Sequence, residues 1–113
     1  MVSAFLRLEG NTVRNRIWSF LFVHEEFDYS MKEIAKYAEV SYAALKEILK
    51  DFIKRELVIH TRDVGNAKMF RLNLNNVQVI TFRDYYWSVV DSEAKKELEE
   101  DEMEKEVLVK HIH

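Results

Sequence analysis

The sequence contains no cysteine, no proline and only two glycines among its 113 residues. Without cysteine the chain can form neither a disulfide framework nor a thiolate zinc site, and it has no cysteine nucleophile. The shortage of glycine and proline removes the residues that make tight bends, which argues against a β-sandwich or barrel. No apolar run approaches the length of a membrane span, and the first ten residues lack the apolar core of a signal peptide. We therefore expect a mostly helical, cytoplasmic protein with no membrane partner.

Charge is distributed unevenly along the chain, although the net charge is only −3. Residues 41–83 carry eight basic and four acidic side chains, whereas residues 91–113 carry nine acidic and four basic ones. A basic segment followed by an acidic one suggests a nucleic-acid partner. The competing interpretation is that a charged content of 33% simply keeps the surface solvated.

Helical periodicity predicts three helices in the first half of the chain. The first runs from Asn11, as its cap, to about Glu25. The second begins at Ser30, which forms a capping box with Glu33, and the third begins at Ser41 and ends near residue 55. The apolar residues expected on their buried faces are Val13, Ile17, Phe20, Leu21 and His24, with Trp18 and Phe22 on a second side, in the first helix; Met31, Ile34, Ala35 and Ala38 in the second; and Leu45, Ile48, Leu49 and Phe52 in the third.

The hydrophobic period then changes from 3.6 residues to two. Residues 57–62 and 67–72 therefore predict two strands, joined by a turn at 63–66 that contains Gly65. Asn75 and Asn76 then cap a last helix, and residues 107–113 carry no assignment. The apolar stripe expected along the last helix consists of Val77, Ile80, Trp87, Val90, Ala94 and Leu98.

The predicted elements follow the order of a winged helix-turn-helix, which is helix, short helix, tight turn, helix, β-hairpin and helix. We predict an α+β, mostly α fold with three helices, a two-stranded β-hairpin wing and a long C-terminal helix. The winged helix-turn-helix occupies residues 1–76, and residues 77–113 form the C-terminal helix, which serves dimerisation and carries the acidic tail. In this fold the third helix enters the major groove of DNA, which is wide enough for one helix.

Short motifs at the expected places add a resemblance to a known group. They are Leu8-x-Gly10-Asn11-Thr12-x-Arg14, Phe27-Asp28-Tyr29-Ser30, Glu33-Ile34-Ala35, Val40-Ser41, Leu57-Val58, Arg62-x-Val64-Gly65-x-Ala67-Lys68 and Leu72-Asn73. In this order and spacing they resemble the archaeal winged-helix transcription regulators of the MarR/ArsR-like group. The resemblance implies binding of double-stranded DNA by a homodimer that is joined through its terminal helices. The group often has glycine at positions 39 and 56, so we expect Glu39 and Glu56 to adopt left-handed or distorted backbone.

Candidate DNA contacts lie on the third helix and on the wing. Residues 42–54 contain no arginine, asparagine or glutamine, the usual readers of guanine and adenine, so DNA shape is expected to contribute to recognition. The competing interpretation is a solvated helix face on which lysines pair with Glu47 and Asp51. The candidates are Ser41, Tyr42, Ala43 and Lys46 for base edges and nearby phosphates, Lys50 and Lys54 for the DNA backbone, and Arg62 and Lys68 on the wing for flanking phosphates.

Other residues are assigned structural roles. Arg14 is expected in a salt bridge, and Arg71 is expected either on phosphate or beside an acidic neighbour. Residues 85–87 combine core and dimer positions rather than stacking on bases. The dimer interface is predicted at Ile80, Trp87, Val90 and Ala94.

Chemistry-bearing motifs are missing from the sequence. It has no phosphate loop, no nucleophile elbow and no HExxH motif, and the two histidines of the C-terminal His-x-His pair are too few for a metal site. We therefore expect no enzyme, metal or cofactor. The alternative to a DNA-binding regulator is a winged-helix protein–protein module, antitoxin-like or part of the transcription machinery, that uses the acidic tail at 99–106.

Overall fold

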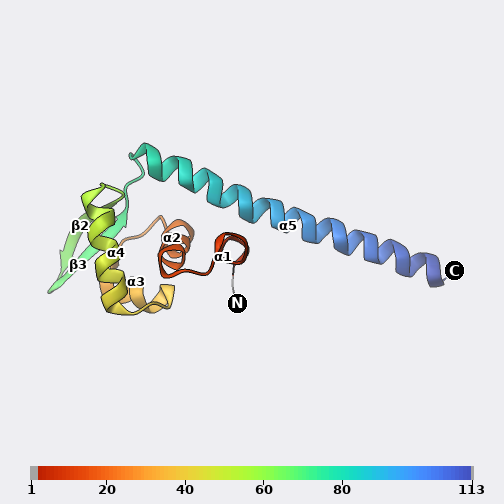
Figure 1. The fold of residues 1–113 in the computed structure, drawn as a ribbon, viewed down its shortest axis with the longest axis horizontal. Helices are drawn as coiled ribbons and strands as arrows, with labels where there is room; N and C mark the ends of the chain where they lie inside the picture. The colour runs from red at the N-terminus through yellow and green to blue at the C-terminus, as the bar shows by residue number, and fades with distance from the viewer. Residues whose placement is uncertain (1–2, 113) are drawn as a thin grey trace.

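The computed structural model describes residues 3–112 and confirms a winged helix with a long C-terminal helix (Figure 1). The distal end of the C-terminal helix projects away from all the other elements, so the molecule measures 66 × 28 × 23 Å. No helix in residues 3–112 is long and apolar enough to cross a membrane. The elements are α1 (Ala4–Glu9), α2 (Val13–Val23), β1 (Tyr29–Ser30), α3 (Met31–Ala38), α4 (Tyr42–Lys54), β2 (Val58–Val64), β3 (Ala67–Leu72) and α5 (Val77–Ile112).

The second and third predicted helices begin where their caps place them. The Ser30 side chain accepts a hydrogen bond from the Glu33 amide, and the Glu33 side chain accepts one from the Ser30 amide, which completes the capping box of α3. The Ser41 side chain caps α4 in the same way by accepting from the amide of Ala44. Glu39 and Glu56 have φ angles of 58° and 59°, so the expected left-handed backbone is confirmed at both positions.

The first predicted helix was wrong in its bounds. Its cap is Thr12 rather than Asn11, because the Thr12 hydroxyl accepts from the Asn15 amide at 3.1 Å, and the helix ends at Val23 rather than near Glu25. The side chain of Asn11 instead accepts from Arg16 Nε at 2.7 Å. Val13 and His24 are exposed, contrary to expectation, because they flank the five buried residues of α2.

The wing is part of a three-stranded antiparallel sheet in the order β1-β3-β2, whereas two strands were expected. β1 adds two residues that pair with β3, Tyr29 opposite Phe70 and Ser30 opposite Met69. β2 extends to Val64, so the expected four-residue turn shrinks to Gly65 and residue 66. Gly65 has φ +60°, as a tight hairpin turn requires.

The first half of α5 packs on α1 and α2. The face that it buries differs from the apolar stripe that the sequence predicts. Val79 and Tyr86 are 0% and 1% exposed, and Phe82 and Val90 pack against the same core. The expected stripe residue Val77 is 74% exposed. Adjacent apolar residues along this helix fit more than one phase, and tertiary contacts select between them. Trp87 and Leu98, also in the expected stripe, are exposed too.

Candidate nucleic-acid interface

The face of α4 that turns away from the core is polar and rich in lysine. Leu45, Leu49 and Phe52 anchor the helix, with 0–1% of each side chain exposed. Lys50 Nζ lies 3.4 Å from the carboxylate of Glu47, an exposed pair that contributes little to stability. The predicted contact residues Ser41, Tyr42, Ala43, Lys46, Lys50 and Lys54 are all exposed.

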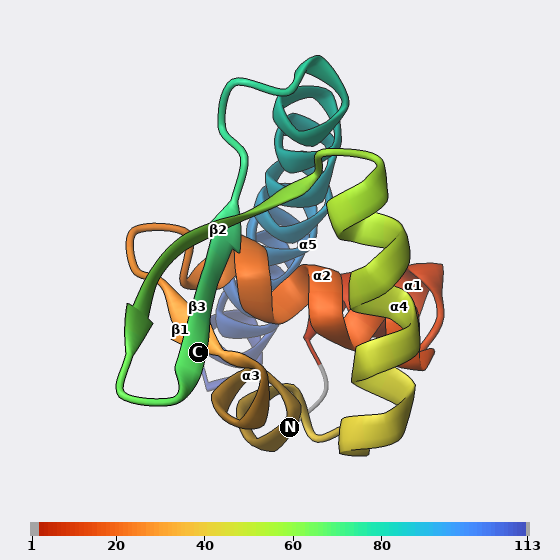
Figure 2. The same cartoon turned by 90° about the vertical axis from the view of Figure 1, so that its left-hand side faces the viewer.

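A hollow of about 380 Å³ joins α4 to the wing and to the start of α3. Tyr42 from α4 and Lys68 from β3, both predicted contacts, line it together with Lys32 from the first turn of α3. Figure 2 shows why, since α3, the N-terminal end of α4 and the turn of the hairpin lie along one edge of the molecule. Sequence reasoning missed Lys32, whose one signal was a basic residue two positions after the Ser30 cap.

The predicted wing contact Arg62 is held by an ion pair. Its guanidinium donates to both carboxylate oxygens of Asp28, at 2.9 and 3.1 Å, and the Thr61 hydroxyl donates to the same carboxylate at 2.6 Å. These bonds, first from Arg62 and then from Thr61, lower the pKa of Asp28 from 3.8 to about 2. The Arg62 side chain is still 63% exposed, whereas that of Asp28 is 14% exposed. Asp28 therefore holds the middle of β2, a role that the sequence did not reveal.

The other wing cations differ in their partners. Lys68 is exposed and has no ion-pair partner within residues 3–112. Arg71 donates to the backbone carbonyl of Glu25 at 3.2 Å rather than to an acidic side chain. Of the two, Lys68 is the one with a free charge to offer a phosphate.

Two arginines of α2 contact the helix-turn-helix that α3 and α4 form. Arg14 lies 3.4 Å from the Asp51 carboxylate and 4.9 Å from the ring centroid of Phe52, so its expected salt bridge is confirmed. Arg16 donates to the backbone carbonyl of Glu39 at 2.9 Å, in the left-handed turn between α3 and α4. The position of α4 is thus fixed near both of its ends by side chains from one helix.

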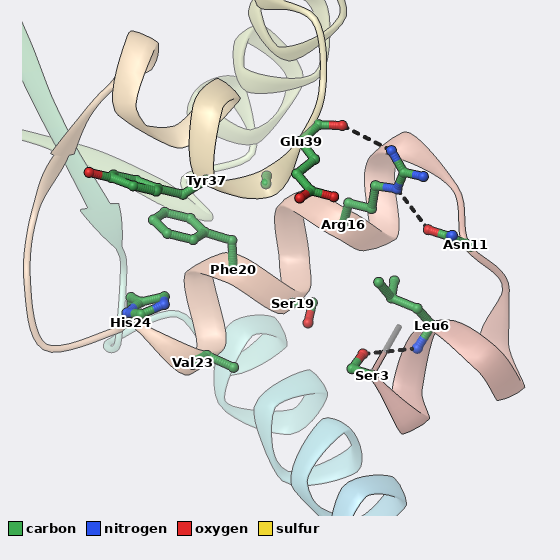
Figure 3. Close-up of a pocket in the computed structure, with 11 residues that line it drawn as sticks. Ser3, Leu6, Asn11, Arg16, Ser19, Phe20, Val23, His24, Tyr37 and Glu39 are labelled. Atoms are coloured by element: carbon green, nitrogen blue, oxygen red, sulfur yellow. Dashed lines mark hydrogen bonds between the residues drawn. The ribbon is translucent and has the colours of Figure 1, made fainter. Parts of the chain in front are cut away.

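Arg16 also lines a hollow of about 330 Å³ between α1, α2 and the α3–α4 turn. Figure 3 shows its side chain bridging Asn11 and Glu39 at one end of this hollow. Phe20, His24 and Tyr37 form the other end.

The predicted dimer residues all lie on α5 but in different surroundings. Trp87 is 37% exposed and Ala94 is exposed, whereas Ile80 is half-buried. Val90 is half-buried and packs on the core of its own chain. The three others recur at intervals of seven residues, which places them along one side of the helix.

The solved structures with this arrangement include a transcription regulator. MepR, which regulates the multidrug efflux pump MepA of Staphylococcus aureus, superposes with a TM-score of 0.63 at 17% identity, over 89% of this chain and 76% of that one. A MepR point mutant bound to an oligodeoxyribonucleotide gives 0.62 at 16% identity, over 96% and 82% of the two chains. A point mutant of Lactococcus lactis ZitR gives 0.58 at 22% identity, over 87% and 69%.

The chain has the same winged-helix fold as these structures. No family model matches the sequence, and no curated protein matches it. Within residues 3–112, no three histidine or acidic side chains gather closely enough to hold a metal ion. The lysine-bearing edge formed by α3, α4 and the wing is the candidate interface with DNA.

Proposed function

We propose that this chain is a sequence-preferring transcription regulator that binds double-stranded DNA as a homodimer. The observation that carries the proposal is the convergence of Lys32, Tyr42 and Lys68 on one hollow, beside the lysine-rich face of α4. In this proposal α4 enters the major groove and the wing lies on the flanking backbone. The chemistry of the face supports DNA over a protein partner, because its exposed positions are mostly charged rather than apolar.

Each contact residue has a proposed role that follows from its place on this edge. The N-terminal end of α4 is nearest the base edges, and the later lysines follow the phosphates. Because α4 has no arginine, asparagine or glutamine, much of the sequence preference comes from DNA shape. We assign base edges and nearby phosphates to Ser41, Tyr42, Ala43 and Lys46, and backbone phosphates to Lys32, Lys50, Lys54, Arg62 and Lys68.

The homodimer is proposed to form along α5. Ile80, Trp87 and Ala94 lie on one side of the helix, next to the face that packs on the core, and Val90 lies between the two. Beyond Ala94 the same side continues with Leu98, which is 64% exposed and which a second copy would cover. A dimer also places two copies of α4 on one duplex, as helix-turn-helix proteins require for paired half-sites.

Fluorescence anisotropy tests the DNA-binding proposal directly. The full chain is titrated into the duplex from upstream of its own gene and into a scrambled duplex, each at two salt concentrations. We expect tighter binding to the upstream duplex and a steep loss of affinity as salt rises, because bound lysines release condensed counterions. No binding to either duplex at low salt would refute the proposal.

A second candidate function rests on the distal part of α5. Met103, Val107 and Leu108 are 53–66% exposed and form, with Glu104, an apolar patch on one side of the helix at the end of the acidic run. Such a surface suits a protein partner with basic and apolar side chains. Pull-down with the full chain and with a Met103→Glu, Val107→Glu variant tests it, since only a partner docked on this apolar patch would be lost from the variant.

A further inference from the structure

Four aromatic rings from three elements meet beside α3. Phe20 comes from α2, His24 from its C-cap, Tyr29 from β1 and Tyr37 from α3. The ring centroid of Phe20 lies 4.8 Å from that of His24, 5.0 Å from that of Tyr29 and 6.0 Å from that of Tyr37. Phe20 is 8% exposed, so it forms the floor, and the three other rings stand around it. Figure 3 shows the rings of Phe20 and Tyr37 side by side, with His24 next to them.

These four rings and one carboxylate line a hollow of about 380 Å³, here called the aromatic hollow. The carboxylate is Glu33, whose Oε1 accepts from the Ser30 amide at 3.0 Å and is held in place by that bond. Its Oε2 accepts no hydrogen bond from any residue between 3 and 112. Neither lysine nor arginine lines the aromatic hollow.

The electrostatics of the aromatic hollow favour positive charge. Ring faces carry negative potential, and the Glu33 carboxylate adds a full negative charge. Burial and then the Glu33 carboxylate raise the pKa of Tyr29, which is the expected response of a phenol to such surroundings. Lys36 Nζ already lies 5.6 Å from the ring centroid of Tyr37, although Lys36 does not line the hollow.

We propose that the aromatic hollow is a binding site for a small organic cation, of the quaternary or tertiary ammonium class. A metal ion would need several oxygen or nitrogen ligands, and the hollow offers one carboxylate among ring faces. An anion would be repelled by Glu33. A weakly hydrated ammonium ion with carbon substituents gains from both features, because its charge meets the carboxylate and the ring faces while its carbons cover apolar surface. The proposal does not depend on DNA binding.

Choline and its neutral analogue 3,3-dimethylbutan-1-ol make a matched pair of probes, because a carbon replaces the charged nitrogen at nearly constant shape. Each is titrated into the full chain at pH 8 and followed by amide chemical shifts. We expect choline to shift the amides of residues 20, 24, 29, 33 and 37, with a dissociation constant about tenfold below that of the analogue. Equal affinities, or no shift with choline, would overturn the proposal.

Three variants locate the site. Tyr37→Leu removes an exposed ring and should weaken choline binding about fivefold, whereas Tyr37→Phe keeps the ring face and should bind as the parent does. Glu33→Gln keeps an oxygen acceptor for the Ser30 amide but removes the charge, and should weaken binding about tenfold. Lys95→Gln, on α5 and away from the hollow, is the control and should bind choline as the parent does. If Tyr37→Leu and Tyr37→Phe bind choline equally while both melt like the parent, the cation is not held by this ring and the site is refuted.

Discussion

The two halves of α5 have similar helical geometry but different surroundings. Near its start, Val79 and Tyr86 are 0% and 1% exposed and pack on α1 and α2, whereas Leu98 and Met103 further along are 64% and 66% exposed. The first half is therefore fixed by the core of its own chain. Within residues 3–112, the second half has only its own backbone bonds and, at its start, one i,i+3 ion pair between Lys96 and Glu93, which contributes a few tenths of a kcal/mol. Its apolar residues gain nothing within one copy, so their contribution depends on what covers them.

Tyr86→Ala should disrupt the packing of the first half of α5 and cause the largest loss of stability. The ring is fully buried between Phe5 and Phe22, and its hydroxyl is 2.9 Å from that of Ser19. We expect a loss of about 3–5 kcal/mol in the free energy of unfolding, measured by urea denaturation. The matched change in the second half, Leu98→Ala, should cost less than about 0.5 kcal/mol at a concentration where the chain is monomeric. Equal losses would show that the distal half is packed after all.

Removing the three lysines at 46, 50 and 68 should abolish most DNA binding while leaving the fold intact. If each neutralises one phosphate, the slope of log affinity against log salt should flatten by about 2.7, and affinity at low salt should fall about a hundredfold. The control replaces Lys95, Lys105 and Lys110 of the distal half by alanine, which makes the same change in net charge. Similar effects from both triple variants would mean that binding follows net charge rather than the proposed edge.

Trp87→Ala tests the proposed dimer interface on α5. A large aromatic residue at the centre of an interface commonly contributes about 2 kcal/mol or more to association. We expect the variant to sediment as a monomer at micromolar concentration and to bind the upstream duplex more weakly. Tyr85→Ala, at a 47% exposed aromatic position on the other side of the helix, is the control. A Trp87→Ala variant that remains an intact dimer would place the interface elsewhere.

Local signals explain how much of the fold could be predicted. The bounds of α3 and α4 followed from Ser30, Glu33 and Ser41, because a cap acts on amides within its own first turn. α1 and β1 were missed because six and two residues are too short for periodicity, and tertiary packing and pairing stabilise them instead. The predicted buried face of α5 was wrong for a similar reason. Several adjacent aromatic residues could each face the core, and only the contacts with neighbouring elements decide which of them is buried.

In the candidate site, too, local sequence signals predict some features and tertiary contacts determine the others. Exposure of the lysines on α4 was predictable, because they fall off a clear apolar stripe. The contributions of Lys32 and Asp28 were not, because each depends on an element that is distant in sequence. The aromatic hollow is a similar case, with rings from α2, β1 and α3.

Glu56→Gly should have a small effect in the opposite direction. Glu56 holds φ 59° just after α4, and a left-handed backbone costs a residue other than glycine about 1–2 kcal/mol. Glycine removes this strain but has more freedom in the unfolded chain, which offsets up to about 1 kcal/mol of the gain. We expect a melting temperature that is unchanged or slightly raised in thermal unfolding. A clear drop would mean that the Glu56 side chain makes a contribution beyond its backbone.

The Asp28–Arg62 pair should produce the smallest effect, confined to the wing and to acid pH. The folded pKa of Asp28, about 2, lies below its ordinary value of 3.8, so the ionised carboxylate stabilises the folded state. This contribution is fully present above about pH 4 and is lost as the pH falls toward 2. Amide protection factors across β2 and β3, which are corrected for the intrinsic exchange rate at each pH, should therefore fall over that range while those in the first half of α5 change less. In Asp28→Asn the wing should exchange faster already at neutral pH and lose the part of its acid dependence that Asp28 supplies. An unchanged acid dependence of the wing in Asp28→Asn would mean that other carboxylates govern it.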